Sequence, residues 1–244
     1  MKFDHPTLAQ IASLRQLWKE AFGDTDSFLD TFYTTAFDPR RSLCATVDGE
    51  IAAMAYWFDC DEYAYIYAVA TAKKHRGKGI CHKLMAHIHS ILTQAGYLGC
   101  ILVPGEESLR QFYAGMGYEN CGGVHEFDAV AGNPLPLRKL EIPEYATLRR
   151  TYLPAGGVIQ EGVSLDFLAS WATFYQGENV LAAAVWEEGK LLVLDLLGDV
   201  QKAPGVVAAL GAETGWFRSP GQTPFAMHRP LNQNKPPKYF AFCF

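Results

Sequence analysis

The fifteen residues 71–85, TAKKHRGKGICHKLM, constrain the fold of this chain more than any other stretch. Four basic side chains and a histidine crowd around two glycines, Gly77 and Gly79, and an amphipathic pattern follows at once. The preceding residues 62–70, EYAYIYAVA, are rich in aromatic and β-branched side chains, which predicts a strand. The expected order is therefore a strand, a glycine-rich turn and a helix.

A helix that is entered through glycines offers free backbone N–H groups and the positive end of its dipole to a phosphate. Two common phosphate motifs do not fit this turn. The P-loop needs other residues at Ala72 and Gly79, and the dinucleotide pattern needs a glycine where His82 stands. The turn matches Arg/Gln-x-x-Gly-x-Gly/Ala except at the first position, where Lys74 replaces arginine or glutamine. A solvated basic turn is the plain alternative for the same residues.

Length and composition narrow the class of protein. A chain of 244 residues with 49% hydrophobic content can bury a sizeable core in one large or two small domains. We expect a cytoplasmic protein with no membrane partner, because no signal peptide and no apolar run of about 20 residues is present. The six cysteines form no Cys-x-x-Cys pair, so we expect reduced, buried thiols and no metal.

The net charge of −5 is unevenly distributed. Residues 1–62 carry 11 acidic and 5 basic side chains, and the basic turn follows directly. This contrast suggests a site with a cationic acceptor on one side and an anionic cofactor on the other. No broad basic face is apparent, which argues against a nucleic-acid partner.

Periodicity predicts the elements of the first half. We expect helices at residues 7–22, 24–36, 77–95 and 108–117, and strands at 2–3, 43–47, 51–58, 62–70, 98–103 and 123–130. Asp24 or Asp26 is the expected cap of the second helix, and Ser108 with Gln111 forms a capping-box pattern. The three histidines of the third helix, His82, His87 and His89, are expected on the solvated surface, because their spacing does not suit chelation.

This order of elements, together with Arg76-Gly77-x-Gly79 and the FY-x-x-x-GY pattern that ends at Tyr118, resembles the GNAT superfamily of N-acetyltransferases. The resemblance covers residues 1–130 and implies an α+β fold, a central, mostly antiparallel twisted sheet flanked by helices. It implies that this domain binds acetyl-CoA as co-substrate. The cofactor-binding residues that the resemblance implies are Val69, Ala70, Thr71, Arg76, Gly77, Lys78, Gly79, Ile80 and Ser108.

Residues 129–143 hold three prolines and a glycine, which predicts a linker. Beyond it, residues 140–244 resemble the degenerate, smaller GNAT-like domain of tandem GNAT proteins. We expect helices at 145–152, 165–175 and 205–210, and strands at 180–186, 191–197, 225–230 and 239–244. No Arg-x-x-Gly-x-Gly follows the hairpin of this half, so we assign it no cofactor and expect it to support the structure or the substrate cleft.

The resemblance also implies a mechanism in which an amine attacks the acetyl thioester directly. Backbone N–H groups at residues 69–71 would meet the oxygen that gains charge, and Tyr113 would serve the leaving thiolate as general acid. Core packing is the alternative role for Tyr113. A catalytically inactive acyl-CoA-binding or scaffold module of the same fold is the alternative function.

The acceptor needs a base or a chain of waters, because a primary amine is neutral only about once in 2,500 molecules at pH 7. The acceptor could be a polyamine, an aminoglycoside, an amino acid or a protein amino group, and the sequence does not indicate the oligomeric state. The terminal carboxylate of Phe244 is one candidate for the base, as in tandem acetyltransferases of the enhanced-intracellular-survival type. The acidic candidates for the base are Glu20, Asp24, Asp26, Asp59, Asp61 and Glu62.

Overall fold

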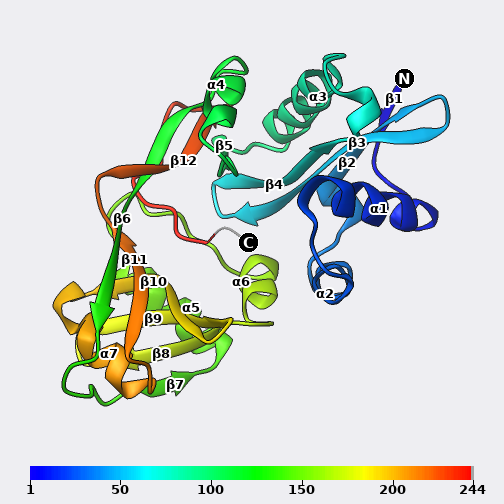
Figure 1. Ribbon diagram of the computed structural model, residues 1–244. Helices are drawn as coiled ribbons and strands as arrows, with labels where there is room; N and C mark the ends of the chain where they lie inside the picture. The colour runs from blue at the N-terminus through cyan, green and yellow to red at the C-terminus, as the bar shows by residue number, and fades with distance from the viewer. Residues whose placement is uncertain (243–244) are drawn as a thin grey trace. The chain divides into compact units, whose positions relative to one another are not determined.

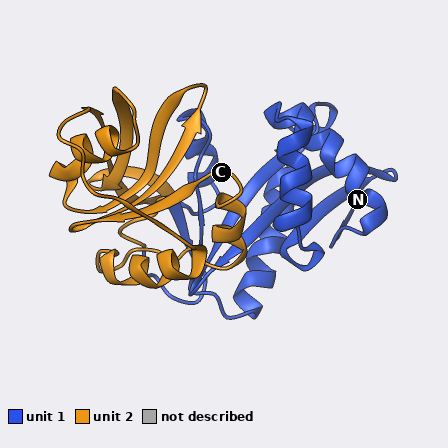
Figure 2. Ribbon diagram, turned by 90° about the horizontal axis from the view of Figure 1, so that it is seen from below, with its two compact units in different colours: residues 1–119, 227–236 blue, residues 120–226, 237–244 orange. Residues whose placement is uncertain are grey.

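The computed structural model describes residues 1–242, which form two compact units (Figure 2). Unit 1 consists of Met1–Glu119 and Met227–Pro236, and unit 2 consists of Asn120–Ala226 and the segment that begins at Pro237. The domain division at residues 130–140 stays a prediction, since these units are defined by packing and are discontinuous in sequence. Phe244, the candidate base at the chain's end, lies outside the described residues.

Unit 1 is built on strands in the order β1-β2-β3-β4-β5-β12. Neighbouring strands are antiparallel except for β4 and β5, which are parallel. The turn between β2 and β3 is the expected Asp48-Gly49, in which both residues have positive φ. The strands are β1 (Lys2–Asp4), β2 (Ser42–Val47), β3 (Glu50–Cys60), β4 (Tyr63–Thr71), β5 (Gly99–Leu102) and β12 (Thr223–Pro230).

Helices cover both faces of this sheet, with α1 and α3 on opposite sides of β3 and β4 (Figure 1). Alternate residues of β3 explain this: Trp57 belongs to the core under α3, whereas Tyr56 contacts the rings of Trp18 and Phe32. The helices are η1 (Leu8–Gln10), α1 (Ile11–Phe22), α2 (Asp26–Thr35), η2 (Pro39–Arg41), η3 (Lys73–His75), α3 (Ile80–Gln94) and α4 (Ser108–Ala114).

The predicted helix caps are wrong, and so is one predicted surface residue. Thr25 caps α2 by accepting from the Phe28 amide at 3.2 Å, while Asp24 accepts from the Trp18 indole. Ser108 is the first residue of α4 rather than its cap, and its hydroxyl donates to Glu106. His89 is only 8% exposed, because it lies on the side of α3 that faces Tyr118.

Unit 2 contains the strand order β6-β11-β10-β9-β8-β7. Two expectations for this half are wrong: the helix at 165–175 ends at Leu168, and residues 239–242 form no strand. The strands are β6 (Glu119–Val130), β7 (Arg138–Leu140), β8 (Thr173–Gly177), β9 (Val180–Glu187), β10 (Lys190–Gly198) and β11 (Thr214–Pro220). The sequence analysis missed β7, β8 and β11. The helices are α5 (Ile142–Tyr152), α6 (Val163–Leu168), η4 (Val200–Lys202) and α7 (Ala203–Ala209).

The core of unit 2 repeats the topology of unit 1. The series β7, α5, α6, β8, β9, β10, η4, α7, β11 follows the same order as β1, α1, α2, β2, β3, β4, η3, α3, β5. The last two strands of each series are parallel, and a register shift interrupts both β3–β4 and β9–β10. The second, smaller domain is therefore a second copy of the same fold.

The last strands are exchanged between the copies. Strand β6, which follows the first series in the chain, pairs with β11, and β12, which follows the second series, pairs with β5. Unit 2 also buries a charge pair, because Arg149 Nε donates to Asp195 at 2.7 Å with both side chains almost fully buried. The hydroxyls of Tyr145 and Tyr239 donate to the same carboxylate.

Candidate functional site

A cleft of about 860 Å³ opens in unit 1 where β4 ends and α3 begins. It combines a short stretch of β4, the glycine-rich turn, the first turn of α3, the last residues of α1 and one side of α4. Its lining residues are Ala21, Phe22, Val69, Ala70, Thr71, His75, Arg76, Gly77, Gly79, Ile80, Cys81, His82, Gly105, Glu106, Leu109, Phe112 and Tyr113.

Strand β4 leaves its neighbour at this cleft. Its ladder with β5 contains three pairs and ends at Tyr65 opposite Ile101, so the last six of the nine residues of β4 have no strand partner on that side. The register against β3 shifts over the same segment, and Ala68 has a φ of 48°. A left-handed alanine costs roughly 1–2 kcal/mol, so the surrounding packing must hold this bulge in place. Val69–Thr71 therefore line the cleft on the side of β4 that no strand covers.

The glycine-rich turn leads into α3 with left-handed glycines, as the sequence predicts. Gly77 and Gly79 have φ values of 73° and 70°, and a Cβ on either would point into open space. Helix α3 is fifteen residues long and has no side-chain cap at its N-terminus. The first N–H groups of such a helix lack partners within the helix, so they remain available to an anion.

Two of the predicted cofactor residues do not line the cleft. The Lys78 ammonium turns back to the carbonyl of Lys74 at 2.8 Å, and Ser108 bonds to Glu106. Arg76 does line the cleft, and its Nε donates to the carbonyl of Thr71 at 3.0 Å, which ties the turn to the end of β4. The other predicted residues of β4, the turn and α3 are brought together, although their roles stay a prediction.

Tyr113 places its ring in the core and its hydroxyl at the cleft. Its side chain is 7% exposed and packs against the rings of Phe112 and Tyr118. Burial raises the pKa of the Tyr113 phenol, and the charge that Cys81 would carry as a thiolate adds to the effect. The hydroxyl makes no hydrogen bond to another described residue, and its raised pKa keeps it protonated, so it is free to donate.

The sequence analysis missed several residues of the cleft. Cys81 stands two residues after Gly79 and lines the cleft together with Tyr113, and burial raises its thiol pKa to about 11. Both ring nitrogens of His75 are buried without a partner at the cleft. Phe22 is 47% exposed at the end of α1, where an acceptor could contact its ring. His75 stands inside the motif and Cys81 lies two residues after it, so their position could have indicated them, whereas nothing in the sequence marks Phe22.

None of the six acidic candidates for the base lines the cleft. Glu20 accepts from the Lys73 amide at 2.6 Å, and Glu62 pairs with Lys235 at 2.9 Å. Asp26 pairs with Arg15 and Lys19, and Asp59 pairs with Arg41 and bonds to Tyr97. Asp24 is held by Trp18, as noted above, and Asp61 lies in the turn between β3 and β4. Among residues 1–242, Glu106 is the one carboxylate that lines the cleft.

Residues 1–242 include no cluster of three or more histidine, cysteine or acidic side chains arranged to hold a metal ion. Within the same described range, no helix combines the length and the apolar character that a membrane span requires.

Comparison with known proteins identifies the family of the domain that contains this cleft. The profile of the acetyltransferase (GNAT) domain matches residues 2–121. A comparison with curated proteins finds no match. Residues 2–121 therefore form a GNAT acetyltransferase domain, and the chain belongs to the GNAT superfamily.

Solved structures extend the likeness to the second domain. A GCN5-related N-acetyltransferase from Kribbella flavida is 18% identical, with a TM-score of 0.72 over 95% of this chain and 71% of that one. A GCN5-related N-acetyltransferase from Anabaena variabilis is 14% identical, with a TM-score of 0.71 over 95% and 73% of the two chains. Eis1 from Mycobacterium abscessus is 12% identical, with a TM-score of 0.68 over 95% and 74%. At these identities the likeness shows a shared fold.

The cleft fits the coenzyme A that GNAT domains bind. The uncapped start of α3 suits a pyrophosphate, and the two left-handed glycines leave room for it at the backbone. The unpartnered polar atoms of His75 and Thr71 offer further hydrogen-bonding positions along the same wall.

Proposed function

We propose that this protein is an N-acetyltransferase that transfers the acetyl group of acetyl-CoA to a primary amine by direct attack. One observation carries the proposal: an uncapped helix N-terminus, an open stretch of β4 and an unpartnered tyrosine hydroxyl meet in a single cleft. The acceptor is a cationic small-molecule or protein amine, in keeping with the acidic excess of residues 1–62. Nucleic acid is not a partner in this proposal.

The chain's own groups divide the work by position. Acetyl-CoA supplies an activated acetyl thioester, which needs no covalent intermediate on the protein. The first N–H groups of α3, with Gly77 and Gly79, bind the pyrophosphate. The backbone N–H groups of Val69–Thr71 stabilise the oxygen that gains charge as the amine attacks.

Tyr113 donates its hydroxyl proton or a hydrogen bond to the sulfur of the leaving thiolate. A phenol is already a weaker acid than a thiol, and burial raises its pKa further, so complete proton transfer to a released thiolate is uphill. The hydroxyl therefore donates a hydrogen bond to the sulfur as charge develops there, or gives up its proton before the carbon–sulfur bond has broken completely. Its position at the cleft without a protein partner supports this role.

Removal of the amine proton is assigned to a chain of waters that ends at a carboxylate. The six acidic candidates hold other partners or lie away from the cleft, and Glu106 is the carboxylate that lines it. The finding that none of the six acidic candidates lines the cleft also favours the alternative function, an acyl-CoA-binding module of this fold that has lost catalysis.

A turnover screen separates these functions. The protein is mixed with acetyl-CoA and a panel of polyamines, aminoglycosides, amino acids and peptides, and release of the free CoA thiol is followed. An amine-dependent release that requires Tyr113 supports the transferase. Tight acetyl-CoA binding with no release for any cationic amine supports the binding module, and a failure to bind acetyl-CoA contradicts both.

A further inference from the structure

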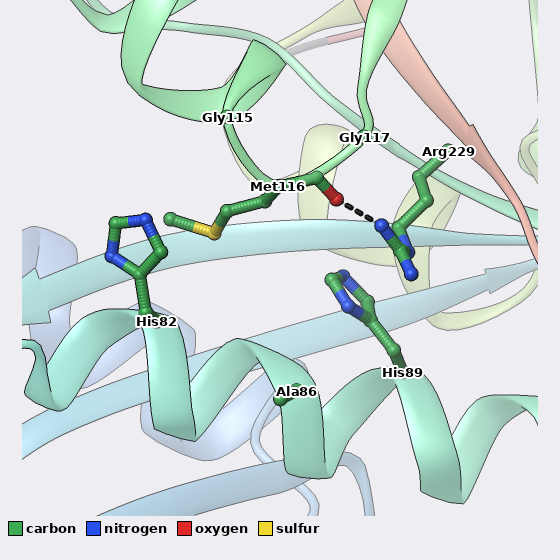
Figure 3. A pocket seen from close by; sticks show the side chains of 7 residues that line it. All are labelled: His82, Ala86, His89, Gly115, Met116, Gly117 and Arg229. Atoms are coloured by element: carbon green, nitrogen blue, oxygen red, sulfur yellow. Dashed lines mark hydrogen bonds between the residues drawn. The ribbon is translucent and has the colours of Figure 1, made fainter.

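A second hollow of about 430 Å³ lies beside the cleft in unit 1, between α3 and the turn that follows α4. Figure 3 shows His82 and His89 on the same side of α3, with Ala86 between them and Arg229 of β12 facing them. The opposite wall is the backbone around Met116, and the glycines that flank Met116 leave it uncovered. No carboxylate of the described part of the chain lines this hollow.

Arg229 brings an uncompensated positive charge to the hollow. Its side chain is half-buried, and none of the ion pairs among the described residues includes it. One guanidinium nitrogen donates to the Met116 carbonyl, whereas Nε is buried with no partner. A buried donor of a charged group costs free energy unless an acceptor satisfies it.

His89 adds a directed donor next to Arg229. Its Nε2 shares a hydrogen bond of 2.9 Å with the Tyr118 hydroxyl. In the tautomer in which Nε2 accepts that bond, the proton lies on Nδ1, which has no other partner among the described residues. Burial and the charge of Arg229 lower the pKa of His89 to about 4, so the ring donates as neutral imidazole at pH 7.

The shape of the hollow favours an elongated ligand with one anionic end. His82 and His89 are seven residues apart on α3, which is about 10 Å along the helix axis, so both cannot contact one anion. Between them lie the methyl group of Ala86 and the side chain of Met116. His82 is exposed, and its ring packs edge-on against that of Phe112 with 4.9 Å between the ring centroids. The His82 ring therefore marks the far end of the hollow.

A structural role for Arg229 does not account for these features. Its bond to the Met116 carbonyl fixes the turn after α4, and a lysine or glutamine could do the same. That role does not explain why Nε has no hydrogen-bond partner or why the guanidinium has no counter-ion among the described residues. They point to an oxyanion, because a guanidinium presents several N–H donors in a fixed fork that suits phosphate.

We propose that this hollow binds a phosphate-bearing small molecule, with its phosphate between Arg229 and His89 and its body over Ala86 and Met116. The phosphate can belong to a free ligand or to the phosphorylated nucleoside end of a coenzyme A in the adjoining cleft, since His82 lines both hollows. The site itself does not depend on the proposed reaction, because inorganic phosphate tests it alone.

Methyl spectroscopy gives a direct readout. The chain has five methionines, so labelled methionine methyl groups give a simple spectrum in which Met116 can be assigned by mutation. Inorganic phosphate is titrated at constant ionic strength. We expect a saturable shift of the Met116 methyl signal, weakened at least tenfold in Arg229→Gln and unchanged in Lys83→Gln, which removes one charge from an exposed position of the same helix.

The Arg229→Lys variant keeps the charge and removes the fork, so it should bind phosphate with intermediate affinity. A wild-type shift that never saturates, or one of equal affinity in Arg229→Gln, overturns the proposal. The wild-type titration decides this even if the variant folds poorly.

A second comparison identifies the source of the phosphate. Coenzyme A and its analogue without the 3′-phosphate are titrated into the wild type and Arg229→Gln. A preference for coenzyme A that disappears in the variant assigns the phosphate to the cofactor. A preference that is equal in both proteins, together with lost binding of inorganic phosphate, assigns the hollow to a separate ligand.

Discussion

Tyr113→Phe tests the most specific chemical role assigned to this chain. The substitution keeps the aromatic ring in the core and removes a hydroxyl that has no partner among the described residues. We therefore expect the free energy of unfolding to change by less than about 1 kcal/mol. Loss of a general acid or of a hydrogen bond to the leaving sulfur should lower kcat about 10²-fold, equivalent to about 2.7 kcal/mol of transition-state stabilisation. The KM for acetyl-CoA should hardly change.

Tyr118→Phe is the matched control. The Tyr118 hydroxyl is fully buried and bonds to His89 at 2.9 Å and to Cys100 at 3.1 Å. Its removal leaves His89 without that partner and should cost about 1–3 kcal/mol of stability, with little effect on kcat. Urea unfolding and steady-state release of CoA thiol measure both quantities. If Tyr113→Phe keeps wild-type kcat and loses stability instead, Tyr113 is a packing residue and the proton donor lies elsewhere.

Three further outcomes are expected. Burial lowers the pKa of His89 and of His228 to about 4, below the unfolded-state pKa of about 6.5. The stability that each neutral imidazole contributes is therefore complete above about pH 6.5 and is lost as the pH falls toward 4, by up to about 3 kcal/mol per histidine. Urea unfolding at pH 7 and pH 4.5 should show a smaller loss for His228→Leu, and an unchanged loss contradicts this account. Calorimetry should give one acetyl-CoA per chain, since unit 2 lacks the glycine turn; two would refute the degenerate second copy. Asp195→Ala should cost about 3–5 kcal/mol in unit 2, because Arg149 would keep a buried charge without its partner; a loss below 1 kcal/mol would show that the pair contributes little.

The order of elements and the glycine-rich turn were predictable from local signals. Glycines at positions 77 and 79 are needed for left-handed backbone, and the apolar stripe after them places α3 on the sheet. These patterns act over a few residues, so the sequence shows them directly. The confirmed fold class, with its second copy of the fold, follows from the same signals repeated along the chain.

Other features depend on contacts between distant segments and could not be predicted. Ala68 has no local reason to adopt positive φ, and the bulge exists because of pairing across β3 and β4. The burial of His89 depends on Tyr118, which is 29 residues away. The place of residues 227–236 in unit 1 arises from the pairing of β12 with β5 across more than half of the chain. Sequence position alone indicated the acidic candidates for the base, but five of the six hold other partners and none of the six lines the cleft.

Calorimetric titration of acetyl-CoA into the wild type, Gly79→Glu and Gly96→Glu tests the central claim most directly. Gly79 and Gly96 flank α3, both have positive φ, and a side chain on either meets open space, so the two substitutions impose similar backbone strain. Only Gly79 lies at the cleft, where a glutamate would place its bulk and its negative charge against the pyrophosphate. The account predicts that Gly79→Glu is folded and no longer binds acetyl-CoA, while Gly96→Glu binds like the wild type. Wild-type affinity in a folded Gly79→Glu protein would contradict it.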